Sequence, residues 1–205
     1  HPTKKHPEKS RGYYKFFDRI YLISASLQSL PMDKLNLNEE RVFTKYSDEI
    51  MKNIIKTEQD DEEANNVLII LDDVIKSLKN NKEAEYLTKC ILNRRHILNN
   101  KDKPGSGGLS IWIMSQKFNA LPLIFRINAS SVYLLSSVVN NQKEKHTIKD
   151  ELMADLSNEE QEDLFKMAFK KKYSNLLILN KQPKKKRYYS NFNLIKFDDN
   201  ESDSD

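Results

Sequence analysis

The chain has 205 residues, a formal net charge of +4 and a single cysteine, Cys90. This length suits one ordinary globular domain, and the lone cysteine excludes an internal disulfide framework, which favours a reducing compartment. No stretch approaches the roughly 18 apolar residues of a membrane span and no apolar signal core lies near the N-terminus, so we expect a soluble, intracellular protein.

Apolar runs alternate with stretches of helical periodicity along the chain. We expect strands at residues 16–24, 67–73, 109–116, 130–138 and 175–180, and an alternating edge strand at 188–197. We expect helices at 46–57, 75–96 and 158–171, the last opened by a capping box of Ser157 and Glu160.

Strands that alternate with helices imply right-handed crossovers and an α/β fold with a mostly parallel sheet flanked by helices. We predict a basic segment at 1–15, one α/β core at 16–197 and an acidic, disordered tail at 198–205. No internal repeat and no second domain is expected.

An unbroken apolar run, VLIIL, ends in two adjacent carboxylates, Asp72 and Asp73. Such a run is typical of a strand buried on both faces, whose end lies at the rim of a parallel sheet, where α/β proteins bind ligands. In one interpretation the pair is a Walker B element, in which Asp72 holds Mg²⁺ and Asp73 polarises the water that attacks ATP. In the other, an aspartate caps the helix that follows.

The next strand predicted along the same rim ends in Ser115 and Gln116. An amide at this position can hydrogen-bond the attacking water or contact the γ-phosphate of ATP. The alternative is a strand end that is simply exposed to solvent. Taken together, two carboxylates and an amide on neighbouring strands have the layout that an ATPase needs.

These motifs and two others stand in an order that resembles the DNA-packaging ATPases of large DNA viruses, the poxvirus-type branch of the FtsK–HerA superfamily. That family has an apolar strand ending in two acids, an Arg-His pair after the following helix, a strand ending in Ser-Gln, and a Leu-Pro…Arg-x-Asn segment. The matching residues, in a resemblance that covers residues 17–179, are Asp72-Asp73, Arg95-His96, Ser115-Gln116, Leu121-Pro122, Arg126 and Asn128.

The resemblance implies a RecA-like P-loop fold that uses ATP and Mg²⁺ and assembles as a homo-oligomeric ring, which moves double-stranded DNA into a viral capsid. It implies double-stranded DNA and capsid or portal-like components as partners, and a host-cell virus factory or the virion as location. By position, Asp72 would hold the metal, Asp73 would be the catalytic base and Gln116 the sensor. Arg126 would approach phosphate or a neighbouring subunit. A cellular translocase of the same superfamily is a further alternative.

Arg94 and Arg95 are candidate trans-acting fingers, because a guanidinium supplied to a neighbour's γ-phosphate raises the rate by about 10³ to 10⁵. In the alternative interpretation, these residues and His96 complement the dipole at the end of the predicted helix. Arg126 has a comparable alternative, as a surface arginine that pairs with an acid.

A P-loop ATPase also needs G-x-x-x-x-G-K-[ST], because its backbone amides cradle the phosphates. The sequence lacks this motif: none of its four glycines precedes a Lys-Ser or Lys-Thr pair. We therefore expect the first strand, the phosphate loop and its helix to be missing, either because the sequence is a fragment of a longer ATPase or because it is a remnant without a nucleotide site. Little ATP hydrolysis is expected from this chain alone. The alternative function is a non-enzymatic, DNA-binding or structural protein of the same fold.

A basic run near the end of the chain matches lysine-rich nuclear import signals and also suits contact with DNA phosphates. It consists of Lys184, Lys185, Lys186 and Arg187. The alternative is a solvated link before the last strand. Tyr188 and Tyr189 could stack on bases, but we expect at least one of them to be buried against the sheet.

Overall fold

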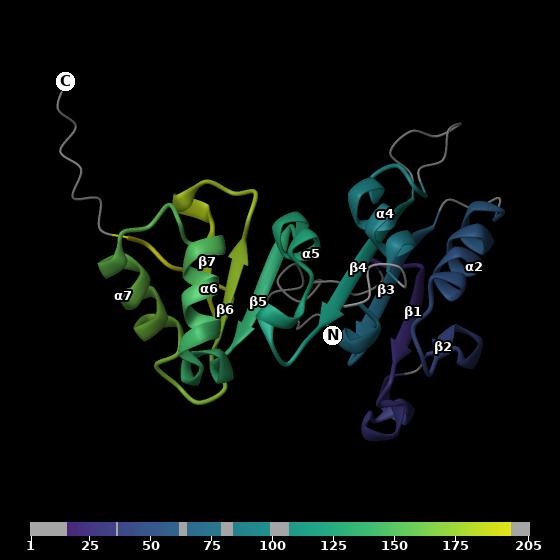
Figure 1. Ribbon diagram of the computed structural model, residues 1–205, viewed down its shortest axis with the longest axis horizontal. Helices are drawn as coiled ribbons and strands as arrows, with labels where there is room; N and C mark the ends of the chain where they lie inside the picture. Colours follow the sequence, from purple (N-terminus) through teal and green to yellow (C-terminus); the bar gives the residue numbers. More distant parts are fainter. Residues whose placement is uncertain (1–15, 36, 62–64, 79–83, 99–106, 198–205) are drawn as a thin grey trace, which may run out of the picture. The chain divides into compact units, whose positions relative to one another are not determined.

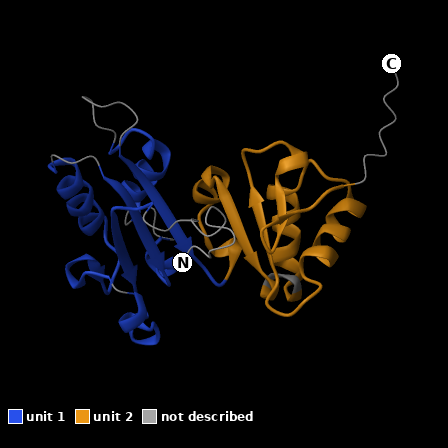
Figure 2. Cartoon of the chain, turned by 180° about the vertical axis from the view of Figure 1, so that it is seen from behind, with its two compact units in different colours: residues 1–116 blue, residues 117–205 orange. Residues whose placement is uncertain are grey.

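The computed structural model describes residues 16–35, 37–61, 65–78, 84–98 and 107–197 (Figure 1). The predicted basic segment 1–15 and the predicted tail 198–205 lie outside these residues. The chain divides into two compact units, residues 1–116 and 117–205, each with a sheet of its own (Figure 2). No helix among the described residues is long and apolar enough to cross a membrane.

Unit 1 contains a four-stranded, wholly parallel sheet in the order β2-β1-β3-β4. Its strands are β1 (Arg19–Ser24), β2 (Val42–Phe43), β3 (Asn66–Asp72) and β4 (Gly108–Met114). The apolar run of β3 is buried, with Val67, Ile69 and Leu71 fully enclosed. The strands predicted at 16–24, 67–73 and 109–116, and the parallel α/β arrangement, are thus confirmed for this unit.

Helices connect the parallel strands of unit 1. They are α1 (Met32–Leu35), α2 (Asp48–Gln59), α3 (Ile75–Leu78) and α4 (Glu85–Asn93), with short 3₁₀ turns at Leu27–Ser29 and Glu39–Arg41. α2 lies where the sequence predicts it and begins at Ser47, whose hydroxyl accepts the backbone N–H of Ile50. Its apolar face buries Met51, Ile54 and Ile55.

The single helix predicted at 75–96 is wrong, because Ala84 is not helical (φ −125°, ψ 19°) and the described residues form two helices, α3 and α4. Ala84 offers no capping side chain. The carboxylate of Asp48, on α2, takes that role by accepting the backbone N–H groups of Tyr86 (2.8 Å) and Leu87 (3.4 Å). A carboxylate satisfies free N–H groups at a helix start and complements the dipole. The start of α4 therefore depends on α2, which is distant in the sequence. The periodicity of apolar residues within 75–96 does not reveal this dependence.

Unit 2 contains a four-stranded antiparallel sheet in the order β5-β6-β7-β8. Its strands are β5 (Ser131–Leu135), β6 (Asn175–Leu179), β7 (Tyr188–Ser190) and β8 (Asn193–Leu194). Its helices are α5 (Leu123–Asn128), α6 (Gln142–Leu152) and α7 (Asn158–Ala168), with 3₁₀ turns at Phe118–Ala120, Ser136–Asn140 and Lys184–Lys186.

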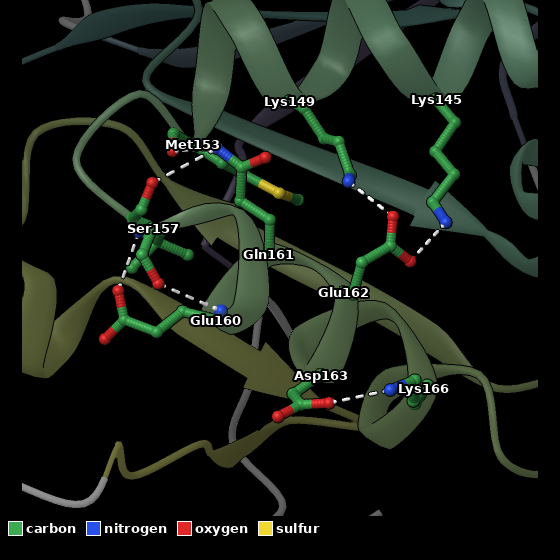
Figure 3. A network of polar contacts seen from close by, with 10 residues as sticks. Lys145, Lys149, Met153, Ser157, Glu160, Gln161, Glu162, Asp163 and Lys166 are labelled. Atoms are coloured by element: carbon green, nitrogen blue, oxygen red, sulfur yellow. Dashed lines mark hydrogen bonds and ion pairs between the residues drawn. The ribbon is translucent and has the colours of Figure 1, made fainter.

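The strands predicted at 130–138 and 175–180 thus exist as β5 and β6, but they do not continue the parallel sheet. Two consecutive helices, α6 and α7, connect them, and each helix reverses the direction of the chain. The second strand therefore returns antiparallel to the first. Only α7 was predicted, and its capping box of Ser157 and Glu160 is confirmed (Figure 3).

The core of unit 2 lies between α6, α7 and one face of the antiparallel sheet. The sheet contributes Leu134, Leu176, Ile178 and Tyr188, which pack in one cluster with Ile148 of α6 and Leu164 of α7. The edge strand predicted at 188–197 is wrong as a single strand: it is the hairpin of β7 and β8. Asn191 and Phe192, at its turn, have φ angles of 47° and 65°, as a type I′ turn requires.

Candidate functional site at the rim of the parallel sheet

The carboxyl ends of three adjacent parallel strands meet at one rim of the unit 1 sheet. In the strand register Ser24 of β1 lies beside Asp72 of β3, and Asp72 lies beside Met114 of β4. Ser115 and Gln116 directly follow β4. The structure therefore brings together the two predicted motifs of unit 1, the carboxylate pair and the Ser-Gln pair, at the edge where α/β sheets bind ligands.

Asp72 is half-buried and is oriented by two serine hydroxyls. Its Oδ2 atom accepts a hydrogen bond from Ser24 Oγ at 2.8 Å and a longer one from Ser26 Oγ at 3.4 Å. Ser24 is fully buried and its Oγ accepts the backbone N–H of Ser26, so the donor is itself fixed. In the described part of the chain Oδ1 of Asp72 accepts no hydrogen bond. One carboxylate oxygen is positioned and the other is available to a ligand.

Asp73 is exposed and has a φ of 52°, in the left-handed region. Aspartate is one of the few residues that tolerate this conformation. The helix-capping interpretation of the pair lacks support: the N–H groups of Ser77 and Leu78 bond to the carbonyl of Val74, and no described N–H of α3 bonds to either carboxylate. The turn instead presents Asp73 to solvent at the rim.

Gln116 is exposed two residues beyond the end of β4. Because Asp72 of β3 pairs with Met114 of β4, the backbone of Gln116 lies just beyond the end of the strand adjacent to the carboxylate pair. The position is the one predicted for an amide that contacts an attacking water or a phosphate. Both this role and the simpler one of a solvated strand end are compatible with its exposure.

Arg95 does not lie at this rim. It is exposed in the turn after α4, and that turn is held at the opposite end of the sheet, where Gln59 Nε2 donates to the carbonyl of Ile97 at 2.8 Å. Gln59 ends α2, which leads to the amino end of β3. The neighbouring Arg94 donates from Nη1 to the carbonyl of Ile91 in the last turn of α4, at 3.0 Å. For Arg94 this is the helix-end role that the alternative interpretation predicts.

Arg126 belongs to unit 2, on α5, where two groups hold its guanidinium. Nη1 forms an ion pair with Glu151 at 2.5 Å, and the guanidinium carbon lies 5.2 Å from the centroid of the Phe118 ring. Its Nε is buried and makes no hydrogen bond to the described residues. The pairing agrees with the alternative of an arginine bound to an acid.

Two members of the basic run 184–187 are engaged by carboxylates of the same unit. Lys184 forms an ion pair with Glu160 at 2.6 Å, and Arg187 with Asp155 at 2.9 Å. Lys185 and Lys186 are exposed. Tyr188 is fully buried, with its hydroxyl donating to Asp155 Oδ1 at 2.8 Å. The prediction that at least one of the two tyrosines is buried is therefore confirmed, and Tyr188 is not available to stack on bases.

Sequence reasoning missed Ser24 and Ser26, which orient Asp72. One signal was present: Ser24 is the last residue of the predicted strand 16–24, which makes it a polar side chain at a parallel strand end. Its significance depends on β1 lying next to β3, since only that pairing places the hydroxyl beside the carboxylate.

The residues of the rim fit a divalent cation that is bound largely through other ligands. Mg²⁺ usually keeps several waters and takes only one or two carboxylates together with substrate phosphates. Asp72, with Oδ1 available, can supply one carboxylate. No group of three or more His, Cys, Asp or Glu side chains in the described ranges could hold a metal ion by itself. A cation at this rim would therefore depend on phosphate oxygens and water.

A wholly parallel sheet connected by helices places this unit in the α/β class, in which ligands bind at the carboxyl ends of the strands. No family model, curated protein or solved structure matches the chain. What the chain does must therefore be inferred from its own residues and geometry.

Proposed function

We propose that the chain is the Mg²⁺- and water-orienting part of an ATP hydrolase, an ATPase core of RecA-like type that acts in moving double-stranded DNA into viral capsids. The observation that supports it best is the rim of β3: Asp72 is oriented by Ser24, and Asp73 is turned outward by its positive φ. The order of motifs in the sequence supports the DNA-packaging assignment within this class.

Each rim residue has a distinct role in this proposal. Mg²⁺, when bound with ATP, neutralises phosphate charge. Asp72 would hold the cation or its waters through the oxygen that no serine occupies. Asp73, exposed beside it, would accept a proton from the attacking water, and the amide of Gln116 would orient that water. The phosphate grip would come from a segment that this sequence does not contain, since it holds no G-x-x-x-x-G-K-[ST].

Arg95 has a place in the proposal only as a residue that acts on a neighbouring subunit. Its position at the amino end of the parallel strands keeps it away from the rim of its own sheet. A ring of identical subunits would allow an exposed arginine to reach a neighbour's phosphates. Arg126 would need to exchange Glu151 for such a ligand.

Binding of Mn²⁺, a paramagnetic substitute for Mg²⁺, tests the rim in the chain as it exists. With Mn²⁺ and ATP present, we expect amide NMR signals of residues 24–26, 72–73 and 115–116 to broaden before others. Asp72→Asn should abolish this broadening, whereas Asp33→Asn, an exposed aspartate on α1, should not. Broadening spread evenly over acidic surface residues in both variants would overturn the metal site.

Hydrolysis tests the catalytic assignment in a protein extended through its native reading frame to include a phosphate loop. Asp73→Asn should lower turnover by about 10² to 10⁴, the range for losing a general base, while ATP binding persists. The Asp33→Asn control should retain full turnover. An Asp73→Asn protein that hydrolyses ATP normally would remove Asp73 from the mechanism.

The second candidate is a non-enzymatic protein that binds DNA or joins a ring as a structural partner. It predicts no rim broadening with Mn²⁺ and ATP, and no ATP binding by either the 205-residue chain or an extended one.

A further inference from the structure

Exposed aromatic rings and lysines gather at one end of the antiparallel sheet in unit 2. We call this group the aromatic–lysine edge. It consists of Tyr133, Lys170, Lys171, Lys172, Tyr173 and Phe192. It is separate from the basic run 184–187, which lies between β6 and β7 at the other end of β6.

The strand register and two hydrogen bonds bring the members of the edge together. Asn175, the first residue of β6, follows Tyr173 by two positions. Its side-chain Nδ2 donates to Asn191 Oδ1 at 3.0 Å, and its carbonyl accepts the Asn191 N–H at 3.3 Å, which anchors the β7–β8 turn beside the start of β6. From that turn, the Phe192 ring reaches Tyr133 in the middle of β5 and stacks on it, with centroids 5.9 Å apart and planes at 30°.

The rings of the edge face solvent although large aromatic side chains are usually buried. Tyr173 is 80% exposed, Phe192 69% and Tyr133 47%. Tyr173 and Phe192 each have a φ of 65°. For Phe192 the type I′ turn requires this angle, whereas for Tyr173 it is a genuine outlier for a bulky residue. Strained backbone of this kind persists only where the surrounding structure enforces it, and it is concentrated at functional sites. Two aromatic rings are thus held outward at the same end of one sheet.

The lysines of the edge lack the acidic partners that occupy the basic run. Lys170, Lys171 and Lys172 are exposed and form no ion pair among the described residues, whereas Lys184 and Arg187 each hold a carboxylate. The carboxylate nearest in sequence, Asp163, is paired with Lys166 at 2.9 Å. Lysines after α7 also complement its dipole, but that role does not account for the exposed rings.

We propose that the aromatic–lysine edge binds single-stranded nucleic acid, with bases stacked on the rings of Tyr173 and Phe192 and backbone phosphates beside Lys170 to Lys172. Stacking platforms next to a basic track are the features by which proteins bind single strands without reading sequence. Lys172 Nζ lies 4.9 Å from the Tyr173 ring centroid, so a phosphate contact and a stacked base would be adjacent. The bases of an intact duplex are already stacked on each other, which favours a single strand as the ligand. The inference does not depend on ATP hydrolysis.

Fluorescence anisotropy with a labelled 15-nucleotide dT strand tests the proposal on the 205-residue chain. Asparagine replaces the rings because it tolerates a positive φ. We expect Tyr173→Asn and Phe192→Asn each to weaken binding of the single strand about 5- to 150-fold, the effect of losing one stacked base. A labelled duplex of the same length should bind more weakly and lose little in either variant.

The charge contribution is measured with two triple variants matched in charge. Changing Lys170, Lys171 and Lys172 to Gln should reduce the dependence of log affinity on log salt by about 2, because each single-strand phosphate contact contributes about 0.7. The control changes Lys184, Lys185 and Lys186 to Gln and should leave single-strand affinity within about twofold. Equal losses in both triples, with no effect of the ring variants, would overturn the site as non-specific charge attraction. Absence of binding to dT at low salt, or binding only to vesicles that contain anionic lipid, would also overturn it.

Discussion

The carboxylates at the rim of the unit 1 sheet differ from three carboxylates on and between the helices α6 and α7 of unit 2. At the rim of the parallel sheet, Asp72 is oriented by hydroxyl groups and Asp73 faces solvent, and neither is ion-paired within the described ranges. In unit 2, Glu151, Asp155 and Glu162 are each held by a lysine or arginine. Carboxylates that stabilise a fold are usually paired within it, whereas unpaired carboxylates at the rim of a parallel sheet are available to a ligand.

The basic residues of unit 2 also fall into two groups, those paired with a carboxylate and those that are not. Near one end of β6, Lys184 and Arg187 are paired with acids. Near the other end, Lys170, Lys171 and Lys172 and the rings of Tyr173 and Phe192 are exposed to solvent. A count of basic residues in the sequence ranks the run 184–187 first as a nucleic-acid contact. The distribution of partners in the structure favours residues 170–173 instead.

The largest loss of stability is expected from truncating a buried side chain on the central strand of each sheet. Ile69 of β3 and Ile178 of β6 are both fully buried. Ile69→Ala and Ile178→Ala should each lower the free energy of unfolding by about 2 to 5 kcal/mol, through lost burial and the cavity that remains. Amide hydrogen exchange should show protection lost in β1, β3 and β4 for the first variant, and in β5 and β6 for the second. Equal loss of protection throughout the chain in both variants would contradict two separate cooperative units.

The sequence predicted unit 1 better than unit 2 for identifiable physical reasons. The central strand of a parallel sheet is buried on both faces, so its apolar run is unbroken and the carboxylates that end it are conspicuous. α6 was missed because Ile148 and Leu152 are its only buried apolar residues in an otherwise charged segment. Without α6, the connection from β5 to β6 contained one predicted helix and implied parallel strands.

The candidate site was predictable in part for a similar reason. Asp72, Asp73 and Gln116 stand at strand ends, which sequence marks directly. The contribution of Ser24 depends on which strand lies beside β3, and that pairing is set by tertiary packing. The positive φ of Tyr173 and Phe192, on which the aromatic–lysine edge depends, breaks the local preference of aromatic residues and has no sequence signature.

An intermediate effect is expected from one buried tyrosine in each unit, Tyr21 and Tyr188, because both donate their hydroxyl to a carboxylate. Tyr21 donates to Glu58 Oε1 at 2.5 Å, and Tyr188 to Asp155 Oδ1 at 2.8 Å. Glu58 is buried, whereas Asp155 is partly exposed; each also keeps an arginine, Arg19 at 3.5 Å for Glu58 and Arg187 for Asp155. In urea unfolding, Tyr21→Phe should therefore cost about 2 to 3 kcal/mol and Tyr188→Phe about 1 kcal/mol. Equal costs would show that burial of the acceptor carboxylate does not determine how much stability the hydrogen bond contributes.

The stability that the Tyr21 hydroxyl contributes should also depend on pH in the alkaline range. Burial, then the bond to Glu58, raises the pKa of Tyr21 from 10.0 to about 12. The stability supplied by its neutral hydroxyl is complete below pH 10, where the unfolded state is also protonated, and is lost as pH rises from 10 towards 12. The difference in unfolding free energy between wild type and Tyr21→Phe should therefore shrink over this range. A difference that grows would contradict the raised pKa.

The smallest effect is expected from Glu162, on the surface of unit 2. Lys145 at 2.7 Å and Lys149 at 2.5 Å bind its two carboxylate oxygens (Figure 3). These hydrogen bonds lower the pKa of Glu162 from 4.5 to about 2. Because 45% of the side chain is exposed, solvent screens both pairs, and Glu162→Gln should cost less than about 1 kcal/mol at pH 7.

The sign of this contribution follows from the lowered pKa. It is complete above pH 4.5, where the carboxylate is ionised in the folded and unfolded states, and is lost as pH falls from 4.5 towards 2. Urea unfolding of wild type and Glu162→Gln should thus converge as the pH falls to about 2. Asp163→Gln removes a carboxylate that, among the described residues, pairs with the more exposed Lys166 alone, and it should change stability less. If Asp163→Gln costs as much as Glu162→Gln, shared contact with two lysines is not what stabilises α6 against α7.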